Sequence, residues 1–345
     1  MTICAPKPLR GPSVEMSQTD SFLELLRRDG VVRTAEARLT PLSGGVSCEI
    51  YLVEDGGEKF VVKRALAKLR VAADWYADIN RNRHEAEYIR YVAKFLPHSV
   101  PVLRQCSSAD NYFAMEFLDG SFSNWKQLML AGKADVKHAV QAGTLLGQIH
   151  RHSTGDAEAR RLFDTGQNFF QLRIEAYLLA TATKHPDLRL QMEAEAARLA
   201  GTSECLVHGD FSPKNILVSP ERMVLLDCEV AWYGDPAFDL SFLLNHFFLK
   251  ALLHAPQDIG MRQMIDSFWS SYQSAHPSPL LEGRVCRLLP MLMLARVDGK
   301  SPVEYLDAPR QQFVREFVRH QLSLETFSLQ DLTNAWFTRV GLFRS

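Results

Sequence analysis

The chain has 345 residues, of which 46% are hydrophobic and 23% charged, and its formal net charge is −1. This composition is typical of a globular protein, and the length predicts one large or two moderate domains. The balanced charge provides no general attraction to nucleic acid or to an anionic membrane, so neither is expected as a partner. The six cysteines form no CxxC pair, which argues against a zinc site or a disulfide framework and fits a reducing cytoplasm.

Residues 1–38 predict a loose leader followed by one helix. The first 20 residues are polar and lack the apolar segment of a secretory signal. Phe22 and Leu26 then have helical spacing, and Gly30 ends the predicted helix.

Residues 39–118 predict a small sheet with one helix. The helix is expected at 82–96, where apolar residues recur at helical spacing before Pro97. The sequence DGG separates two of the strand-like stretches and is typical of a hairpin. The strand-like stretches lie at 37–45, 47–54, 58–66, 100–108 and 111–120.

Residues 119–345 predict a larger and mainly helical region. A short β segment at 216–230 interrupts it, with two strands around the turn SPER. The apolar stretch 240–255 is broken by Asn245, His246 and Lys250, so we expect a buried helix and not a membrane span. The order of these regions predicts an α+β protein with two lobes.

The stretch HGDFSPKNIL, residues 208–217, contains the residues that phosphoryl transfer requires. Asp210 and Asn215 have the spacing D-x-x-x-x-N of a kinase catalytic loop. A carboxylate can accept the proton of an acceptor hydroxyl, and an amide oxygen can bind Mg²⁺. Asp227 ends the following strand, where it can hold a metal ion against the phosphates.

Single residues of this region also have structural explanations. An aspartate in a loop is more often a turn or cap residue, and a histidine such as His208 more often packs in a core. Asp235 and Asp239, in GDPAFDL, are expected to cap a helix and brace the loop. The ordered combination of these residues is what favours catalysis.

HGDFSPKNILV followed by LLDCEVAWYGDPAFDLSFL resembles the aminoglycoside phosphotransferase and choline kinase superfamily, the small-molecule branch of the protein-kinase-like fold. The resemblance covers about Leu42 to Leu244. It implies that Asp210 is the catalytic base, that Asn215 and Asp227 bind Mg²⁺, and that ATP is the phosphoryl donor. A protein kinase would carry HRD and DFG where this chain has His-Gly-Asp and Asp-Cys-Glu.

The small predicted domain contains candidates for the nucleotide site. The loop LSGGVS, with Gly44, Gly45 and Ser47, could approach the phosphates, although a plain hairpin turn would also explain a Gly-Gly pair. Lys63 follows three apolar residues in FVVKRAL, an order resembling V-A-I-K that favours a phosphate contact.

Two further features complete this predicted nucleotide site. Glu85 lies one turn into the next helix and could pair with Lys63, with Glu87 as the rival residue on another helix face. FAMEFLDG resembles a hinge, in which the carbonyl of Glu116 and the amide of Leu118 would meet adenine.

The acceptor is less well defined by the sequence. Residues 241–345 contain 11 Lys and Arg against 9 Asp and Glu, a slightly basic balance. Arg173 and Glu175 are expected at the mouth of the cleft, and Arg296 and Asp298 lie in a second charged cluster with Lys300. Ion pairs at helix ends would explain these residues equally well. Arginine in the pocket would favour a neutral or anionic hydroxyl compound over a polycationic aminoglycoside.

Two other function classes are compatible with these sequence features. An aminoglycoside-resistance enzyme is the first alternative, and a nucleotide-binding pseudokinase is the second. The presence of Lys63, Asp210, Asn215 and Asp227 argues against the pseudokinase. The sequence leaves the oligomeric state open.

Overall fold

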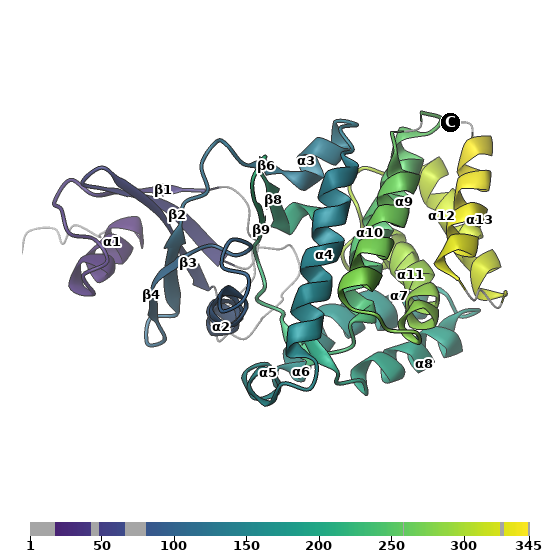
Figure 1. Cartoon of the computed structure of the whole chain (residues 1–345), viewed down its shortest axis with the longest axis horizontal. Helices are drawn as coiled ribbons and strands as arrows, with labels where there is room; N and C mark the ends of the chain where they lie inside the picture. Colours follow the sequence, from purple (N-terminus) through teal and green to yellow (C-terminus); the bar gives the residue numbers. More distant parts are fainter. Residues whose placement is uncertain (1–17, 43–47, 66–80, 258, 325–327, 344–345) are drawn as a thin grey trace, which may run out of the picture.

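The computed structural model describes residues 18–42, 48–65, 81–257, 259–324 and 328–343, which fold into two lobes (Figure 1). The smaller lobe is built on a five-stranded antiparallel sheet, and the larger lobe is mostly helical. The predicted two-lobed α+β fold is therefore confirmed.

The sheet of the small lobe has the strand order β1-β2-β3-β5-β4. Gly56 and Gly57 join β2 to β3, and both have the positive φ that a tight hairpin requires. The lobe consists of α1 (Gln18–Arg28), β1 (Arg38–Pro41), β2 (Cys48–Asp55), β3 (Glu58–Ala65), α2 (Arg81–Ala93), β4 (Leu103–Ser107) and β5 (Tyr112–Glu116).

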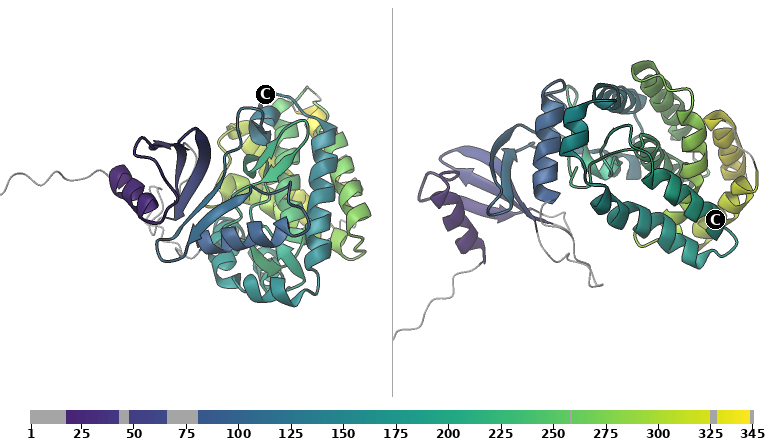
Figure 2. Two further views of the ribbon diagram at one scale, coloured as in Figure 1. Left: turned by 60° about the vertical axis from the view of Figure 1, so that its left-hand side comes forward. Right: turned by 90° about the horizontal axis from the view of Figure 1, so that it is seen from below.

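The two helices of the small lobe cover opposite faces of its sheet. Val62 of β3 shares a core with Phe22 of α1, whereas the preceding Val61 packs in the core that includes α2. Lys63 alternates with Val62 and so points toward α2. Figure 2 shows α1 on the side of the small lobe that faces away from the helical lobe. The helix predicted as part of a separate leader is thus packed on the sheet, because its apolar face needs a partner.

The large lobe surrounds two small β elements with helices. β7 pairs with β10, and β8 pairs with both β6 and β9. The short strands are β6 (Ser123–Asn124), β7 (Cys205–Val207), β8 (Ile216–Val218), β9 (Met223–Leu225) and β10 (Trp232–Gly234). The helices are α3 (Trp125–Leu130), α4 (Val136–Ser153), α5 (Ala157–Leu162), α6 (Gly166–Phe169), the π-helix η1 (Phe170–Leu179), α7 (Ala180–Lys184), α8 (Arg189–Ala200), the 3₁₀ turn η2 (Pro213–Asn215), α9 (Ala237–His254), α10 (Met261–Ala275), α11 (Leu281–Asp298), α12 (Ala308–Leu322) and α13 (Leu329–Leu342).

Close packing of helices fixes the frame of this lobe. At Gly143 of α4 a Cβ atom would lie 2.3 Å from the carbonyl oxygen of Phe268, so α4 and α10 can approach only because the residue is glycine. All side chains of α9 from Ala237 to Leu252 are buried, which confirms the predicted buried helix. Within the described ranges, no helix has the length and apolar character that crossing a bilayer requires.

Candidate active site

Lys63 lies at the centre of a buried ion-pair network between the lobes. Its Nζ is 2.6 Å from Oε2 of Glu85 on α2 and 2.6 Å from Oδ1 of Asp227, which follows β9. Burial opposes the charge of Lys63, but the two carboxylates outweigh burial and raise its pKa well above the usual value. Glu87 forms a surface pair with Arg90 at 3.1 Å, so Glu85 is the α2 glutamate that meets Lys63.

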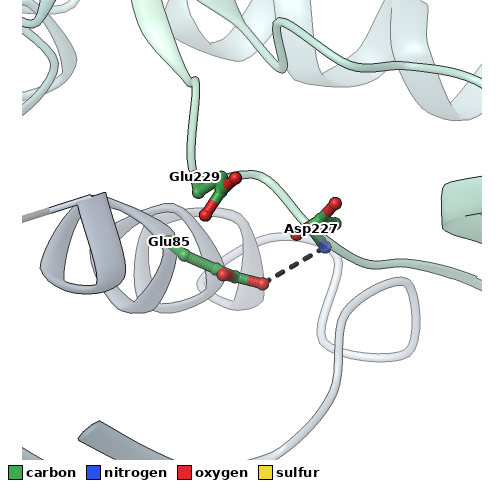
Figure 3. Close-up of side chains that lie close together, drawn as sticks. All are labelled: Glu85, Asp227 and Glu229. Atoms are coloured by element: carbon green, nitrogen blue, oxygen red, sulfur yellow. Dashed lines mark hydrogen bonds between the residues drawn. The ribbon is translucent and has the colours of Figure 1, made fainter. Parts of the chain in front are cut away.

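The backbone of Asp227 is held in a conformation that few residues adopt. Its φ is 60°, in the left-handed region, and its N–H donates to Oε1 of Glu85 at 3.2 Å (Figure 3). A non-glycine residue in this region costs free energy and is typical of functional sites. Burial works against ionisation of Asp227, yet Lys63 and Lys214 keep the pKa of this carboxyl below its usual value.

A third carboxylate, Glu229, joins this group. Single oxygen atoms of Glu85, Asp227 and Glu229 all lie within 4.8 Å of one another (Figure 3). Glu229 also accepts a hydrogen bond from Nε of Arg81 at 3.0 Å. Because Mg²⁺ prefers carboxylate oxygens, this donor set fits a divalent cation. No metal role was predicted for Glu229, the last residue of Asp-Cys-Glu; its position two residues after Asp227 was the available signal.

Asp239, in the first turn of α9, fixes the loop that precedes Asp210. Its carboxylate accepts the backbone N–H groups of His208 at 2.7 Å and Gly209 at 3.0 Å. Gly209 has φ of 76°, and a Cβ there would lie 2.5 Å from the carbonyl oxygen of Val230, so only glycine fits. His208 is buried and accepts the backbone N–H of Asp210 through Nδ1 at 3.2 Å.

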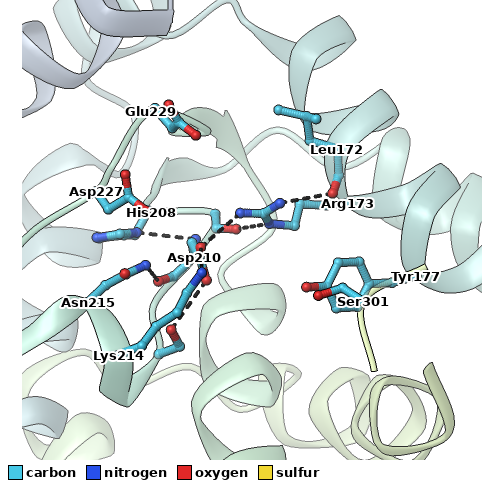
Figure 4. A network of polar contacts seen from close by, with 12 residues as sticks. Leu172, Arg173, Tyr177, His208, Asp210, Lys214, Asn215, Asp227, Glu229 and Ser301 are labelled. Atoms are coloured by element: carbon cyan, nitrogen blue, oxygen red, sulfur yellow. Dashed lines mark hydrogen bonds and ion pairs between the residues drawn. The ribbon is translucent and has the colours of Figure 1, made fainter. Parts of the chain in front are cut away.

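Asp210 carries a carboxylate that two cations hold in the ionised form. Its Oδ2 is 3.1 Å from Nη2 of Arg173 and 3.0 Å from Nζ of Lys214 (Figure 4). Burial alone would favour the protonated acid, but Lys214 and Arg173 lower the pKa of Asp210 far below its usual range. Asp210 is therefore ready to accept a hydrogen bond at neutral pH.

Asn215 connects the catalytic loop to the carboxylates near Lys63. Its Nδ2 donates to the backbone carbonyl of Asp210 at 3.0 Å, which leaves the amide oxygen as the group that can bind a metal ion. Asn215 and Asp227 lie on the same side of Asp210 (Figure 4). The structure thus brings together the base candidate and both metal-binding candidates of the sequence analysis.

The four candidate acceptor residues lie in different surroundings. Arg173, on the π-helix η1, contacts Asp210 and also donates through Nη1 to its neighbour's carbonyl at 2.9 Å. Arg296 donates to the hydroxyl of Tyr177 at 3.2 Å, next to Arg173. Glu175 forms a half-exposed pair with Lys300 at 2.8 Å.

Asp298 and Asp235 are occupied by ion pairs within the helical lobe. Asp298 pairs with Arg315 at 2.8 Å and with His185 at 2.9 Å. Asp235 is fully buried and pairs with Arg198 at 2.5 Å. Its other oxygen accepts the N–H of Ala237 at 2.9 Å, a contact that braces the start of α9.

Glu116 lies at the end of β5, where the chain passes from one lobe to the other. Its side chain pairs with Arg222, in the β8–β9 turn, at 2.8 Å. This pair ties the predicted hinge to the large lobe and was not expected from the sequence. Leu118 follows two residues later, whereas Gly44, Gly45 and Ser47 lie outside the described residues.

A protein-family model matches most of the residues of both lobes. The model of the "Phosphotransferase enzyme family" covers residues 38–265. The chain belongs to this family. The membership agrees with the resemblance found in the sequence motifs, and it confirms the predicted enzyme class, a kinase that phosphorylates a hydroxyl of a small molecule.

Two bacterial kinases are similar in sequence to this phosphotransferase. Methylthioribose kinase of Bacillus pumilus is 25% identical over 269 residues, covering 69% of this chain and 67% of the relative. Methylthioribose kinase of Pectobacterium atrosepticum is 24% identical over 275 residues, covering 69% and 68%.

Solved structures share the fold. Amicoumacin kinase hAmiN, in complex with AMP-PNP, Ca²⁺ and Ami, is 15% identical with a TM-score of 0.53, over 87% of this chain and 93% of that one. LicA in complex with AMP is 15% identical with a TM-score of 0.51, over 94% and 97%.

Proposed function

We propose that this phosphotransferase moves the γ-phosphoryl group of Mg²⁺-ATP to a hydroxyl of a small neutral or anionic molecule. The observation that carries the proposal is the position of Asp210, an ionised carboxylate on a rigid loop beside Asn215 and Asp227. Phosphoryl transfer depends mainly on positioning and on neutralising charge, and this arrangement can do both.

On this proposal, the small lobe binds the nucleotide. The backbone at Glu116 and Leu118 would hold adenine, the loop with Gly44, Gly45 and Ser47 would cover the phosphates, and Lys63 would bind a phosphate oxygen. Glu85 keeps Lys63 in place through their 2.6 Å contact.

The residues that would bind the metal ion lie beside Lys63, whose Nζ is 2.6 Å from Oδ1 of Asp227. Asn215 and Asp227 would hold Mg²⁺, with Glu229 as a further oxygen donor. When bound, Mg²⁺ would neutralise the phosphate charge that develops during transfer.

Asp210 would orient the acceptor hydroxyl and accept its proton. Since its pKa is lowered by Lys214 and Arg173, it acts first by holding the hydroxyl in line, and it takes the proton as the new bond to phosphorus forms. Arg173 keeps both the carboxylate and the loop in position by contacting Asp210 and the carbonyl of Gly209.

The charges around Asp210 disfavour a polycationic acceptor. Arg173 and Lys214 both lie within 3.1 Å of its carboxylate, and a third cationic group would be repelled there. An aminoglycoside-resistance function is therefore the weaker candidate. The assembled set of Lys63, Asp210, Asn215 and Asp227 likewise argues against a pseudokinase.

A coupled assay of ADP release tests this function. The protein is incubated with Mg²⁺-ATP and a panel of hydroxyl compounds that includes methylthioribose and kanamycin. We expect turnover of a neutral or anionic compound and little with kanamycin. Efficient phosphorylation of kanamycin would overturn the acceptor class, and a panel without any phosphorylated product would count against the enzyme activity.

Two variants separate the proposed roles. Asp210→Asn should reduce turnover by about 10²-fold or more while Mg²⁺-ADP affinity stays near that of the wild type. Asp227→Ala should weaken Mg²⁺-nucleotide binding as well as turnover, and a titration of Mg²⁺ measures this difference. Near-normal turnover of Asp210→Asn would exclude Asp210 as the base.

A further inference from the structure

Lys250 is a fully buried lysine that pairs with no carboxylate in the part of the chain that the structure describes. It lies on α9 with 0% of its surface exposed. Among the described residues, the polar group that its Nζ meets is the hydroxyl of Tyr305, at 3.5 Å, and the ring of Tyr305 lies below it at 4.8 Å. The nearby acid, Glu304, pairs with Lys126 at 2.5 Å and is mostly exposed. A hydroxyl and an aromatic ring do not neutralise a buried ammonium group.

His246 lies on the same side of α9, one turn before Lys250. It is 6% exposed, and its Nδ1 is buried without a hydrogen-bond partner in the described part of the chain. One further turn back, Phe242 packs edge-on against His246, with ring centroids 6.0 Å apart. Residues at this spacing form one stripe along a helix, so His246 and Lys250 continue the stripe that begins at Phe242.

Arg296, on α11, brings a second cation close to this stripe of α9. Its Nη1 donates to the hydroxyl of Tyr177 and to Ser301, but its Nε is buried and has no partner among the described residues. Arg296 acts on both Lys250 and His246 as a like charge, as does Lys126. Lys250, His246 and Arg296 therefore form a cluster of buried nitrogen groups, which we call the Lys250 cluster.

The Lys250 cluster contains buried cationic groups whose positive charge is not balanced by a neighbouring anion of the described residues. Burial, together with the charges of Lys126 and Arg296, lowers the pKa of Lys250 to about 7. Burial also lowers the pKa of His246 well below its usual value, and Lys250 and Arg296 add to that effect. A bound oxyanion would supply the missing acceptor for all three groups, because charge-assisted hydrogen bonds to carboxylate or phosphate are the strong ones.

The Lys250 cluster is connected to the catalytic base by a short row of side chains. Tyr177 accepts a hydrogen bond from Arg296 and lies with its ring centroid 5.9 Å from the guanidinium of Arg173. Arg173 in turn contacts Asp210 at 3.1 Å (Figure 4). Phe242 packs against Tyr177 with ring centroids 5.5 Å apart. An acceptor with its hydroxyl at Asp210 could thus extend along Tyr177 and Phe242 toward Lys250.

We propose that Lys250, Arg296 and His246 bind a carboxylate or phosphate group of the acceptor, so that the substrate of this kinase is a hydroxyl compound with an anionic end. The proposal rests on the proposed function and narrows its acceptor class from neutral or anionic to anionic. Tyr177 and Phe242 would pack against the part of the acceptor between the two ends.

Calorimetric titration tests the anion site independently of catalysis. The protein is saturated with Mg²⁺-ADP, so that the nucleotide site is filled, and then titrated with acetate or with inorganic phosphate at pH 8. We expect one of these anions to bind and to cause net proton uptake, since Lys250 becomes fully charged when an anion pairs with it. Proton uptake is measured by repeating the titration in buffers with different ionisation enthalpies.

Three variants test which side chains bind the anion. Lys250→Met and Arg296→Gln should each weaken anion binding by about tenfold or more, the loss of a charge-assisted hydrogen bond. Lys250→Met should also abolish the proton uptake. Lys133→Met removes an exposed lysine between α3 and α4 and should leave both quantities unchanged. Equal Mg²⁺-ADP affinity in all variants shows that each is folded.

Turnover with matched compounds identifies the anion. Glycerate is compared with glyceramide, and glycerol 3-phosphate with glycerol, in the wild type and in Lys250→Met. A preference for the charged member of one pair that is lost in Lys250→Met supports the site and distinguishes carboxylate from phosphate. Anion binding that is equal in wild type and Lys250→Met, or absent from both, overturns the proposal. Anion binding without any phosphoryl transfer would leave the site standing and contradict the proposed function.

Discussion

Lys63 and Lys250 are two buried lysines in the same molecule with opposite surroundings. Lys63 is 3% exposed and Lys250 is 0% exposed, so burial penalises both charges to a similar degree. Lys63 has Glu85 and Asp227 at 2.6 Å and a raised pKa, whereas Lys250 has a hydroxyl at 3.5 Å and a pKa lowered to about 7. Burial therefore does not decide the charge of a lysine; the groups that meet its ammonium do.

This difference separates the two sides of the proposed active site. On the nucleotide side, the protein supplies both the cation and the carboxylates, and Mg²⁺ and phosphate would enter an already neutralised network. At the far end of the acceptor side, in the Lys250 cluster, the described residues supply cations without a paired carboxylate. The second side gains most from a ligand that brings negative charge.

The largest effect on stability is expected from Lys63→Met. The substitution leaves the carboxylate of Glu85 buried without its cation, and breaking a buried pair in this way costs about 3–5 kcal/mol. Urea unfolding measures the loss of unfolding free energy. An unchanged midpoint would mean that the Lys63 pair contributes nothing to stability.

Lys250→Met should have the opposite effect on the free energy of unfolding. Methionine fills a similar volume without a buried ammonium, so we expect the variant to be more stable than the wild type by about 3 kcal/mol at pH 7. Urea unfolding of the variant and the wild type measures this gain in stability. Destabilisation by Lys250→Met would show that Lys250 has a favourable partner in the free protein.

The pH dependence of stability gives a second test of the unpaired state of Lys250. Because the pKa of Lys250 falls from 10.5 to about 7 on folding, the unfolded chain binds more protons between these values. The wild type should therefore lose stability relative to Lys250→Met as pH falls from about 10.5 to 7, by no more than about 1.4 kcal/mol per pH unit. Below pH 7 the difference should stay constant. Unfolding free energies of both proteins at pH 10, 8.5, 7 and 6 test this, and parallel curves would contradict the lowered pKa.

The smallest effect is expected from Glu175→Gln. Glu175 and Lys300 pair at 2.8 Å, but both side chains are nearly half exposed. Such a pair contributes about 0–1 kcal/mol and is screened by salt. A larger change in stability, or a change in acceptor KM, would place this pair in the acceptor site after all.

Features set by neighbouring residues could be predicted from the sequence. The β2–β3 hairpin follows from alternating apolar residues around DGG, and the buried α9 follows from its apolar run. The positions of Asp210, Asn215 and Asp227 could also be predicted to meet, because a short loop and a hairpin leave little freedom between them.

Features that depend on distant segments were decided only by the tertiary structure. Docking of α1 on the sheet, the pair of Glu116 with Arg222 and the grouping of Glu229 with Asp227 and Glu85 all join side chains whose meeting no local pattern specifies.

Lys63 and Lys250 show most clearly what the sequence determines and what only the tertiary structure decides. The sequence determined that Lys63 and Lys250 each lie within an apolar segment, and apolar neighbours predict burial for both. Whether a buried lysine is paired depends on which carboxylates other segments bring within a few ångströms, since the electrostatic interaction is strong only at short range in a poorly solvated interior. Glu85 and Asp227 are brought to Lys63 by α2 and β9, whereas the tertiary structure brings Arg296 and Tyr305 to Lys250.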